Sequence, residues 1–275
     1  MRTSFHTGFL SGVPVLDAIM QVRDAGFDGV ELNAETLPWA DPHIGPGTPP
    51  AVIDRIAATG AVTSIAAHRA GLADPDPERR REAVDWTLEL ARISVDLGAP
   101  LIHVIPGDEP EDSVFTSRKP RGDVAAFLES LTMLVEQTAP LGVVVGLEPI
   151  VNQLISTTDQ ALDVLRAVPG LGISFDPSHL EVTTHDVTDA AQRLGDRTVI
   201  AALKDAEGEP RRFTFPALGS GDVDFVGMLK ALRGRGFDGT VVVEHEAHLF
   251  GDERSLAEVL AQSHAFARRV IDASG

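Results

Sequence analysis

Carboxylate side chains directly follow several short apolar segments of this chain. Glu148 follows VVVGL, Asp176 follows GISF and Glu244 follows TVVV. A carboxylate at the end of an apolar segment is costly to desolvate unless it is paired, protonated or bound to a cation. Glu148 and Glu244 are therefore the strongest candidates for chemistry, with Asp176 beside them.

Histidines occupy similar positions. Asp176 and His179 lie three residues apart in FDPSH, across a turn that contains Pro177, so both could face one cavity and bind a metal or orient a substrate hydroxyl. His68 and His103 also follow apolar segments. A lone histidine there is more often a satisfied core residue or a substrate hydrogen-bond donor than a metal ligand. Any one of these residues could instead cap a helix or pair with a neighbour.

Eight short segments are the expected strands that position these residues, and the seven after the first are rich in Val, Ile or Leu. Longer amphipathic segments alternate with them. In residues 77–98, apolar residues recur at spacings of three or four and Gly98 supplies a stop, which predicts a helix. The expected strands are RTSFH (2–6), GVELN (29–33), AVTSIAA (61–67), LIHVI (101–105), VVVGLE (143–148), GISFD (172–176), TVIAALK (198–204) and TVVVE (240–244).

The eightfold alternation of strand and helix predicts a parallel sheet closed into a (β/α)8 barrel. No linker or low-complexity tract divides the chain, so we expect one domain over residues 1–275. An open doubly wound sheet is the alternative, but no G-x-G-x-x-G follows the first expected strand. Reactive groups in such barrels project from the carboxyl ends of the strands. The residues expected to converge on one axial pocket are therefore Glu31, His68, His103, Glu148, Asp176 with His179, Lys204 and Glu244.

Composition narrows the classes of partner. The chain has 275 residues with 43% hydrophobic content, and 41 acidic against 23 basic residues give a formal charge of −18. This charge disfavours binding to a phosphate backbone, so no nucleic-acid partner is expected. The absence of cysteine removes disulfides and thiolate ligands. No apolar run is long enough for a membrane span, and we expect a cytoplasmic protein with no membrane partner.

The motifs of the chain resemble the xylose isomerase-like barrel superfamily, which includes sugar isomerases, ketose 3-epimerases, dehydratases and endonuclease IV-type enzymes. The resemblance covers nearly the whole chain. It rests on GFDGVEL (26–32), LEP (147–149), FDPSH (175–179), LKDAEG (203–208), LGSGDVDF (218–225) and GFDGTVVVEHE (236–246).

The resemblance implies a divalent cation, which family members hold with Glu, Asp, His and Glu. The matching positions are Glu148, Asp176 and Glu244, whereas Ala202 stands where the family has its strand-seven histidine. Three carboxylates still suit Mn²⁺ or Mg²⁺, with weaker binding than a complete site and less preference for Zn²⁺. Without a metal, the carboxylates would share a proton and Lys204 would offset their charge.

The leading hypothesis is a sugar or cyclitol isomerase or epimerase, with Glu148 and Glu244 as the acid–base pair beside a substrate carbonyl. His68, His103, His179 and Lys204 would contact the substrate. A lyase or dehydratase acting on a keto-sugar, keto-cyclitol or C-glycoside begins with the same proton abstraction. A barrel that only binds sugar, or serves as a subunit of a complex, is the third interpretation, supported by Ala202.

Two further expectations concern the substrate and the assembly. Trp39, in TLPWAD, could stack on a sugar ring, cover a neighbouring subunit or pack within its loop. Family resemblance suggests a homo-oligomer by analogy. The DNA-repair nuclease branch is disfavoured by the charge and by the missing strand-seven histidine.

Overall fold

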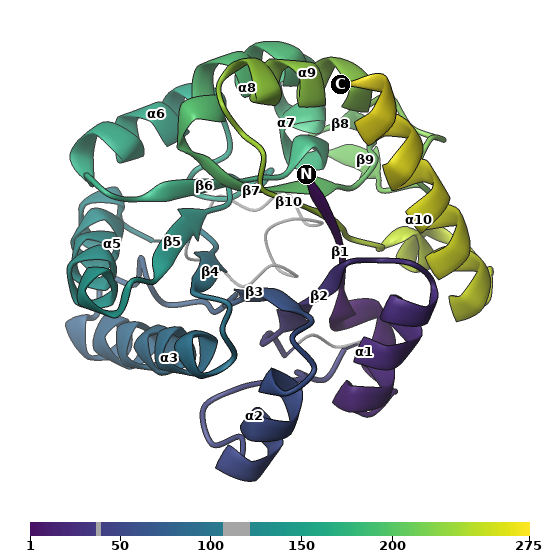
Figure 1. Cartoon of the computed structure of the whole chain (residues 1–275). Coiled ribbons are helices and arrows are strands. Elements are labelled where there is room, and N and C mark those ends of the chain that lie inside the picture. Colours follow the sequence, from purple (N-terminus) through teal and green to yellow (C-terminus); the bar gives the residue numbers. More distant parts are fainter. Residues whose placement is uncertain (37–39, 107–121) are drawn as a thin grey trace.

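The computed structural model describes residues 1–36, 40–106 and 122–275. Eight parallel strands close into a barrel in the order β1-β10-β7-β6-β5-β4-β3-β2, with helices around it (Figure 1). The predicted (β/α)8 barrel is confirmed. Its strands are β1 (Arg2–His6), β2 (Gly29–Asn33), β3 (Val62–Ala66), β4 (Leu101–Val104), β5 (Val144–Leu147), β6 (Gly172–Phe175), β7 (Thr198–Leu203) and β10 (Thr240–Val243).

The barrel closes by pairing its first strand with its last. In this pairing Arg2 lies opposite Thr240 and Phe5 lies opposite Val243. The strands read as nearly continuous apolar runs because both the lumen and the helical layer cover them. Glu148, Asp176, Lys204 and Glu244 each come directly after the last residue of a strand. The closed sheet therefore brings polar residues from distant parts of the sequence to one end of the barrel.

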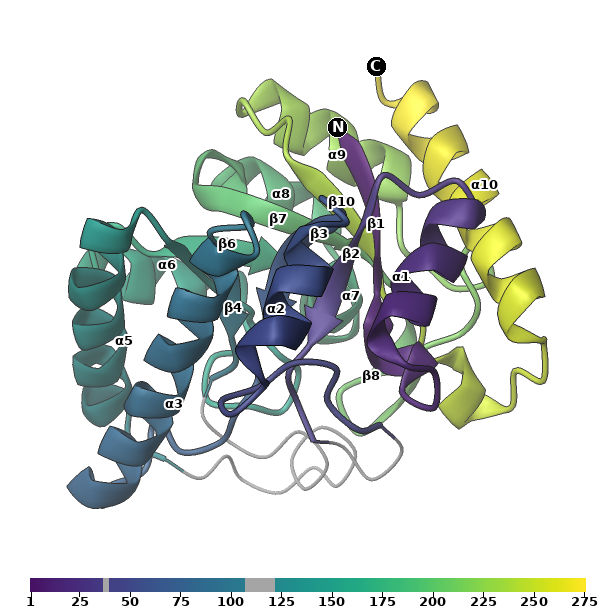
Figure 2. The ribbon, with the colours of Figure 1, turned by 60° about the horizontal axis from the view of Figure 1, so that its bottom comes forward.

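The helices form the outer layer, as the side view in Figure 2 shows. The helix predicted over 77–98 is α3 (Pro77–Asp96); the Asp76 side chain accepts a hydrogen bond from the Glu78 amide at its start. Gly98 follows its end with a φ of 69°, which glycine adopts without strain. The other helices are α1 (Val15–Asp24), α2 (Pro50–Ala57), α5 (Val124–Thr138), α6 (Thr158–Ala167), α7 (Pro177–Thr184), α8 (Val187–Leu194), α9 (Phe225–Gly234) and α10 (Leu256–Ala273).

A small hairpin interrupts the connection after β7. Strands β8 (Glu207–Glu209) and β9 (Arg212–Thr214) pair antiparallel in a segment that the sequence predicted only as a loop. Gly208 has a φ of 108°, and a Cβ there would lie 2.3 Å from the Arg212 carbonyl oxygen. Because each strand has only three residues, the segment lacks the alternating pattern that identifies a longer strand.

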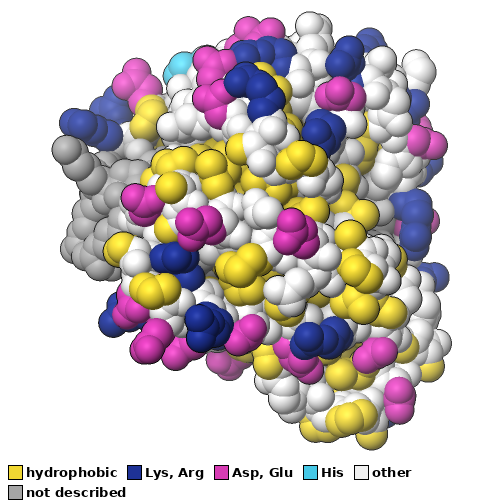
Figure 3. Space-filling view, turned by 90° about the vertical axis from the view of Figure 1, so that its left-hand side faces the viewer, with side chains coloured by type: hydrophobic (Ala, Val, Ile, Leu, Met, Phe, Trp, Pro, Cys, Tyr) yellow, Lys and Arg dark blue, Asp and Glu magenta, His cyan; other side chains and the backbone are white. Residues whose placement is uncertain are grey.

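The outer surface mixes charged and apolar side chains. Figure 3 shows acidic, basic and hydrophobic side chains interspersed on the side of the barrel that carries α5 and α6. Val124, Met133 and Leu141, on or beside α5, are each about two-fifths exposed. The predicted homo-oligomer stays a prediction.

No helix in the part of the chain that the structure describes has the length and apolar character needed to cross a bilayer.

Candidate active site

The site residues predicted from the sequence lie at the carboxyl end of the barrel, except Trp39, which is outside the described residues. His103 belongs to β4, His68 lies two residues after β3, and His179 lies in the first turn of α7. Contacts link these histidines to the four residues that follow β5, β6, β7 and β10. The resulting cluster divides into a histidine side and a lysine side, which meet at Glu148 and Asp176.

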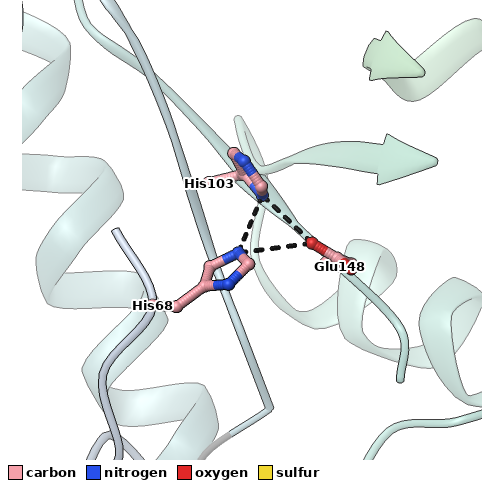
Figure 4. A group of neighbouring side chains, drawn as sticks. All are labelled: His68, His103 and Glu148. Atoms are coloured by element: carbon pink, nitrogen blue, oxygen red, sulfur yellow. Dashed lines mark hydrogen bonds and ion pairs between the residues drawn. The ribbon is translucent and has the colours of Figure 1, made fainter. Parts of the chain in front are cut away.

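The histidine side consists of His68, His103 and Glu148, which Figure 4 shows, together with Glu31, which contacts His103. Glu148 Oε2 lies 3.3 Å from His68 Nε2 and 3.1 Å from His103 Nδ1, and these two nitrogens lie 3.1 Å apart. The opposite nitrogen of His103 lies 3.0 Å from Glu31 Oε2. All four side chains are buried. This side is a dense network of charge-assisted contacts.

Buried residues that the sequence analysis did not single out complete this network. Glu35 Oε2 lies 3.3 Å from His68 Nδ1, His6 Nδ1 lies 3.2 Å from Glu31 Oε1, and Ser64 Oγ donates to Glu31 Oε2 at 2.6 Å. Glu31 and Ser64 are on neighbouring strands, where they lie in register. The inward orientation of Ser64 could have been inferred from strand alternation, whereas Glu35 lies beyond the end of its strand.

The charges of the histidine side stabilise one another. Burial by itself would raise the pKa of Glu148, but hydrogen bonds from His103 and His68 hold it well below its ordinary value. Burial likewise disfavours the charged form of His103, yet the neighbouring Glu31 and Glu148 raise its pKa to about 9. The pKa of His68 is raised well above its ordinary value because Glu148 and Glu35 outweigh its burial. Glu148 is thus held as an anion beside protonated imidazoles.

The lysine side is organised around Lys204, whose ammonium group is buried. Lys204 Nζ lies 2.8 Å from Glu246 Oε2, 3.3 Å from Glu244 Oε1 and 3.7 Å from Asp176 Oδ2. The ammonium also lies 4.5 Å from the centre of the Phe215 ring. These carboxylates raise the pKa of Lys204 well above its ordinary value, although burial opposes them. Lys204 therefore remains a cation.

Two carboxylates on the lysine side titrate near neutrality. Burial raises the pKa of Glu244 to about 7 although Lys204 opposes the shift, and nearby Glu246 adds to it. Burial also raises the pKa of Asp176 to about 6, against the effect of Lys204. The Glu244 side chain remains 20% exposed. A carboxyl group with these properties can accept and return a proton at physiological pH.

Glu246 is the main residue of this side that the sequence analysis left out. It makes the shortest of the three ion pairs to Lys204, and its side chain is 18% exposed. The strand ends at Val243, so the alternation rule did not determine the direction of Glu246. The spacing of two residues between Glu244 and Glu246 was the available signal.

Asp176 and His179 are held together by the start of α7. Asp176 is the N-cap of this helix, and its Oδ1 accepts a hydrogen bond from the Ser178 amide at 2.8 Å. One turn later, His179 Nε2 lies 3.5 Å from Asp176 Oδ2 and 3.7 Å from Glu148 Oε1. Burial lowers the pKa of His179 to about 3, and Lys204 contributes to the shift. The His179 imidazole is therefore neutral.

Two groups of side chains have ligand atoms close enough to share a metal ion. One consists of His68, His103 and Glu148, and the other of Glu148, Asp176 and His179. Asp176 Oδ2 is buried and accepts no hydrogen bond from the described residues, so this oxygen is available to a cation. The donor sets thus fit a divalent metal. Over the described ranges, Glu244 belongs to neither group.

Two curated proteins resemble this chain in sequence. It is 29% identical to a putative L-ribulose-5-phosphate 3-epimerase of Escherichia coli K12 over 174 residues, which cover 61% of this chain and 58% of that protein. It is 27% identical to a rhizopine catabolism protein of Rhizobium meliloti over 261 residues, which cover 85% of this chain and 75% of that protein. The first alignment thus spans less than two thirds of the relative.

Solved structures share the barrel. The IolI protein with a bound zinc atom superposes with a TM-score of 0.79 at 17% identity, over all of this chain and 99% of that one. A D-psicose 3-epimerase of Clostridium cellulolyticum H10, solved with D-tagatose, gives a TM-score of 0.76 at 21% identity, over 98% of this chain and 99% of that one. At these sequence identities, the structural similarity shows a shared fold.

The fold and a match over nearly the whole sequence identify the family of this chain. The closed parallel barrel carries its polar residues at the carboxyl ends of the strands, as the motifs predicted. The family model described as the xylose isomerase-like TIM barrel matches residues 19–270, which is nearly the full length. The chain therefore belongs to the xylose isomerase-like TIM barrel family.

Proposed function

We propose that this protein is a sugar or cyclitol isomerase or epimerase that transfers a proton at a carbon beside a carbonyl group. The observation that carries the proposal is the contact between buried Lys204 and the partly exposed carboxylate of Glu244 at 3.3 Å. It combines a proton acceptor near neutral pKa with a fixed positive charge. The similarity to a putative sugar-phosphate epimerase supports the same class of reaction.

In this proposal Glu244 takes the proton from the substrate carbon. The electron pair of the broken C–H bond forms a carbon–carbon double bond, and the π pair of the carbonyl group moves onto its oxygen, which becomes the enediolate oxygen. The Lys204 ammonium stabilises that negative charge because it is held in a water-poor lumen by its carboxylate partners. Glu246 keeps Lys204 in place through the shorter ion pair at 2.8 Å.

Glu148 is proposed as the second carboxylate of the acid–base pair. It faces the same cluster, and protonated His68 and His103 contact its Oε2 atom. Because Glu148 is itself an anion, the proton that it relays to the substrate would come from the His68 or His103 imidazolium in contact with its Oε2 atom. Return to the same carbon from the opposite face gives an epimer, and return to the former carbonyl carbon gives an isomer. His179 and the histidine side would also donate to substrate oxygens, and Trp39 remains a predicted stacking residue.

A divalent metal fits this reaction as a Lewis acid that polarises the substrate carbonyl. Glu148 and Asp176 would hold it, since Asp176 Oδ2 is buried without a hydrogen-bond donor among the described residues. The third protein ligand would be Glu244, as the family pattern predicts, or His179. Oxygen-rich ligation favours Mn²⁺ or Mg²⁺.

Deuterium exchange tests this function. The protein is incubated in deuterated water with ketoses, their phosphates and keto-cyclitols, and products are followed by NMR and mass spectrometry. We expect one deuterium at the inverted or newly protonated carbon. The Glu244→Gln variant should lose at least about a hundredfold in turnover, since it removes the base. Glu253→Gln is the matched control, because Glu253 is an exposed glutamate nine residues further on.

Other products would overturn the proposal. A product that has lost the mass of a leaving group would identify a lyase that uses the same proton abstraction. Binding without exchange or conversion across the whole panel would favour a barrel that only binds sugar. Full activity in Glu244→Gln would remove the assigned base.

A further inference from the structure

The side chains around Asp176 suggest how this chain compensates for the missing strand-seven histidine. We propose that His179 supplies the imidazole ligand of a metal centre completed by Glu148 and Asp176, while Glu244 stays outside the coordination sphere. The inference deepens the proposed metal-assisted reaction and rests on it for its role in turnover. Metal binding itself can be measured without substrate.

The distances around His179 fit ligands of a shared ion better than hydrogen bonds. His179 Nε2 lies 3.5 Å from Asp176 Oδ2 and 3.7 Å from Glu148 Oε1, which is longer than a good hydrogen bond. Ligand atoms at about 2.1 Å from one ion are separated from each other by about 3 to 3.6 Å. All three ligand atoms lie within 4.8 Å of one another.

The two carboxylate oxygens of Glu148 have separate surroundings. Oε2 is contacted by His68 at 3.3 Å and by His103 at 3.1 Å, whereas Oε1 lies 3.7 Å from His179 Nε2. The histidine side thus occupies one oxygen and orients the other toward Asp176. Hydrogen bonds to a ligating carboxylate usually have this function of fixing its direction.

The surroundings of Asp176 point to the same place. Its Oδ1 atom is held by the Ser178 amide, and Oδ2 is buried without a hydrogen bond from any described residue. The Lys204 ammonium lies 3.7 Å from Oδ2, which is too far for a hydrogen bond, so the cost of burying this oxygen is only partly offset and a closer cation would stabilise it. His179 lies one helical turn away on α7, so the backbone of that helix fixes the spacing between the two ligands.

The Glu244 carboxylate makes its ion pair on the lysine side of the site. Its Oε1 atom pairs with Lys204 at 3.3 Å, and it is absent from both groups that could hold a metal among the described residues. The neighbouring strand position that bears the imidazole in the family is Ala202, which has no ligand atom. An ion without that imidazole would gain a nitrogen ligand by lying closer to α7. This placement leaves Glu244 free for proton transfer.

Metal titration of chelator-treated protein tests the inference. Mn²⁺ is added to the wild type and to His179→Gln, Glu244→Gln and His185→Gln, and binding is followed by calorimetry and by the EPR signal of free Mn²⁺. His185 is the matched control because it directly follows the same helix and its side chain is 56% exposed. Loss of a direct ligand should weaken binding at least about tenfold, as even loss of an outer partner commonly does.

We expect one Mn²⁺ per wild-type chain, tenfold or greater weakening in His179→Gln, and binding close to wild type in Glu244→Gln and His185→Gln. Equal binding in His179→Gln and wild type would overturn the inference. So would a loss in Glu244→Gln as large as that in His179→Gln, or no binding to the wild type. Circular dichroism shows whether each metal-free variant is folded.

A crystal structure of the wild type with Mn²⁺ gives an answer that needs no variant. Anomalous scattering should place the ion against His179, Glu148 and Asp176, and an ion on Glu244 or between His68 and His103 would overturn the inference. Turnover is measured separately. If the ion binds at His179, Glu148 and Asp176 but no sugar exchanges a proton, the proposed function is refuted and the ligand set stands. If sugars exchange a proton but the ion binds elsewhere, the ligand set is refuted and the proposed function stands.

Discussion

The histidine side and the lysine side of the lumen use similar side chains in different ways. On the histidine side, carboxylates and imidazoles alternate at 3.0 to 3.3 Å, and each partner holds the other in its charged form. On the lysine side, one ammonium is shared by three carboxylates at 2.8 to 3.7 Å, and the pKa of Glu244 is raised to about 7. The first arrangement fixes charges, and the second leaves a carboxyl group able to exchange its proton.

The comparison implies that rigidity and reactivity are separated within one site. Balanced ion pairs on the histidine side orient Glu148, whereas an excess of carboxylates over cations on the lysine side keeps a proton acceptor near neutrality. Substitutions on the two sides should therefore differ in their effect on the stability of the fold.

Removing the shared cation should have the largest effect. In Lys204→Met, Glu244, Glu246 and Asp176 lose their common partner, so their pKa values rise and the enediolate loses its stabilising charge. We expect turnover to fall by at least about a hundredfold. Steady-state rates over a range of pH measure this, with the exposed Lys230→Met as control. A variant with wild-type rates would show that the lysine side is not reactive.

Breaking the histidine side should cost stability in addition to the turnover that depends on Glu148. Glu148→Gln leaves His68 and His103 without the anion that faces both of them, and we expect a loss of about 3 kcal/mol in the free energy of unfolding. Urea unfolding of metal-free protein at pH 7 measures it. The same protocol on Glu244→Gln should give a smaller loss, because Glu244 is more exposed and partly protonated. Similar losses in both variants would contradict the contrast between the two sides.

A single supporting hydrogen bond should have a smaller effect. Ser64→Ala removes the donor that contacts Glu31 Oε2 at 2.6 Å, and hydrogen bonds to charged groups contribute about 1.5 to 3 kcal/mol. We expect a loss near the lower figure, with turnover nearly unchanged because Ser64 does not touch the lysine side. A large loss of turnover at unchanged stability would show that the two sides are not separable.

The two sides should also differ in the pH range over which they affect stability. Glu244 has a folded pKa of about 7 against an ordinary value of 4.5, so the native state binds more protons and stability falls as pH rises from 4.5 to 7. His103 has a folded pKa of about 9 against 6.5, so its contribution is complete below pH 6.5 and is lost by pH 9.

Comparing the wild type with a variant of each residue isolates the pH range over which that residue affects stability. The free energy of unfolding of wild type minus that of Glu244→Gln should change between pH 4.5 and 7, and the difference for His103→Gln should change between pH 6.5 and 9. Urea titrations of metal-free protein at several pH values measure both differences. Identical ranges for the two variants would show that both sides titrate as one unit.

The sequence predicted the barrel because its signals are local. The eight apolar segments, and helix signals such as those over 77–98, appear within windows of a few to about twenty residues. The polar residue after each strand then follows from the rule that strand ends carry the site, and Glu148, Asp176, Lys204 and Glu244 were found in this way. The β8–β9 hairpin was missed because three-residue strands carry too little pattern.

The sequence by itself determined the fold, the family resemblance and the loss of an imidazole at Ala202. Only the tertiary structure decided that Glu246 lies closest to Lys204, that the two oxygens of Glu148 face different partners, and that His179 lies beside Asp176 Oδ2. These are relations between atoms from different strands, brought together when the barrel closes. Charge and pKa depend on those distances, so they cannot be read from spacing along the chain.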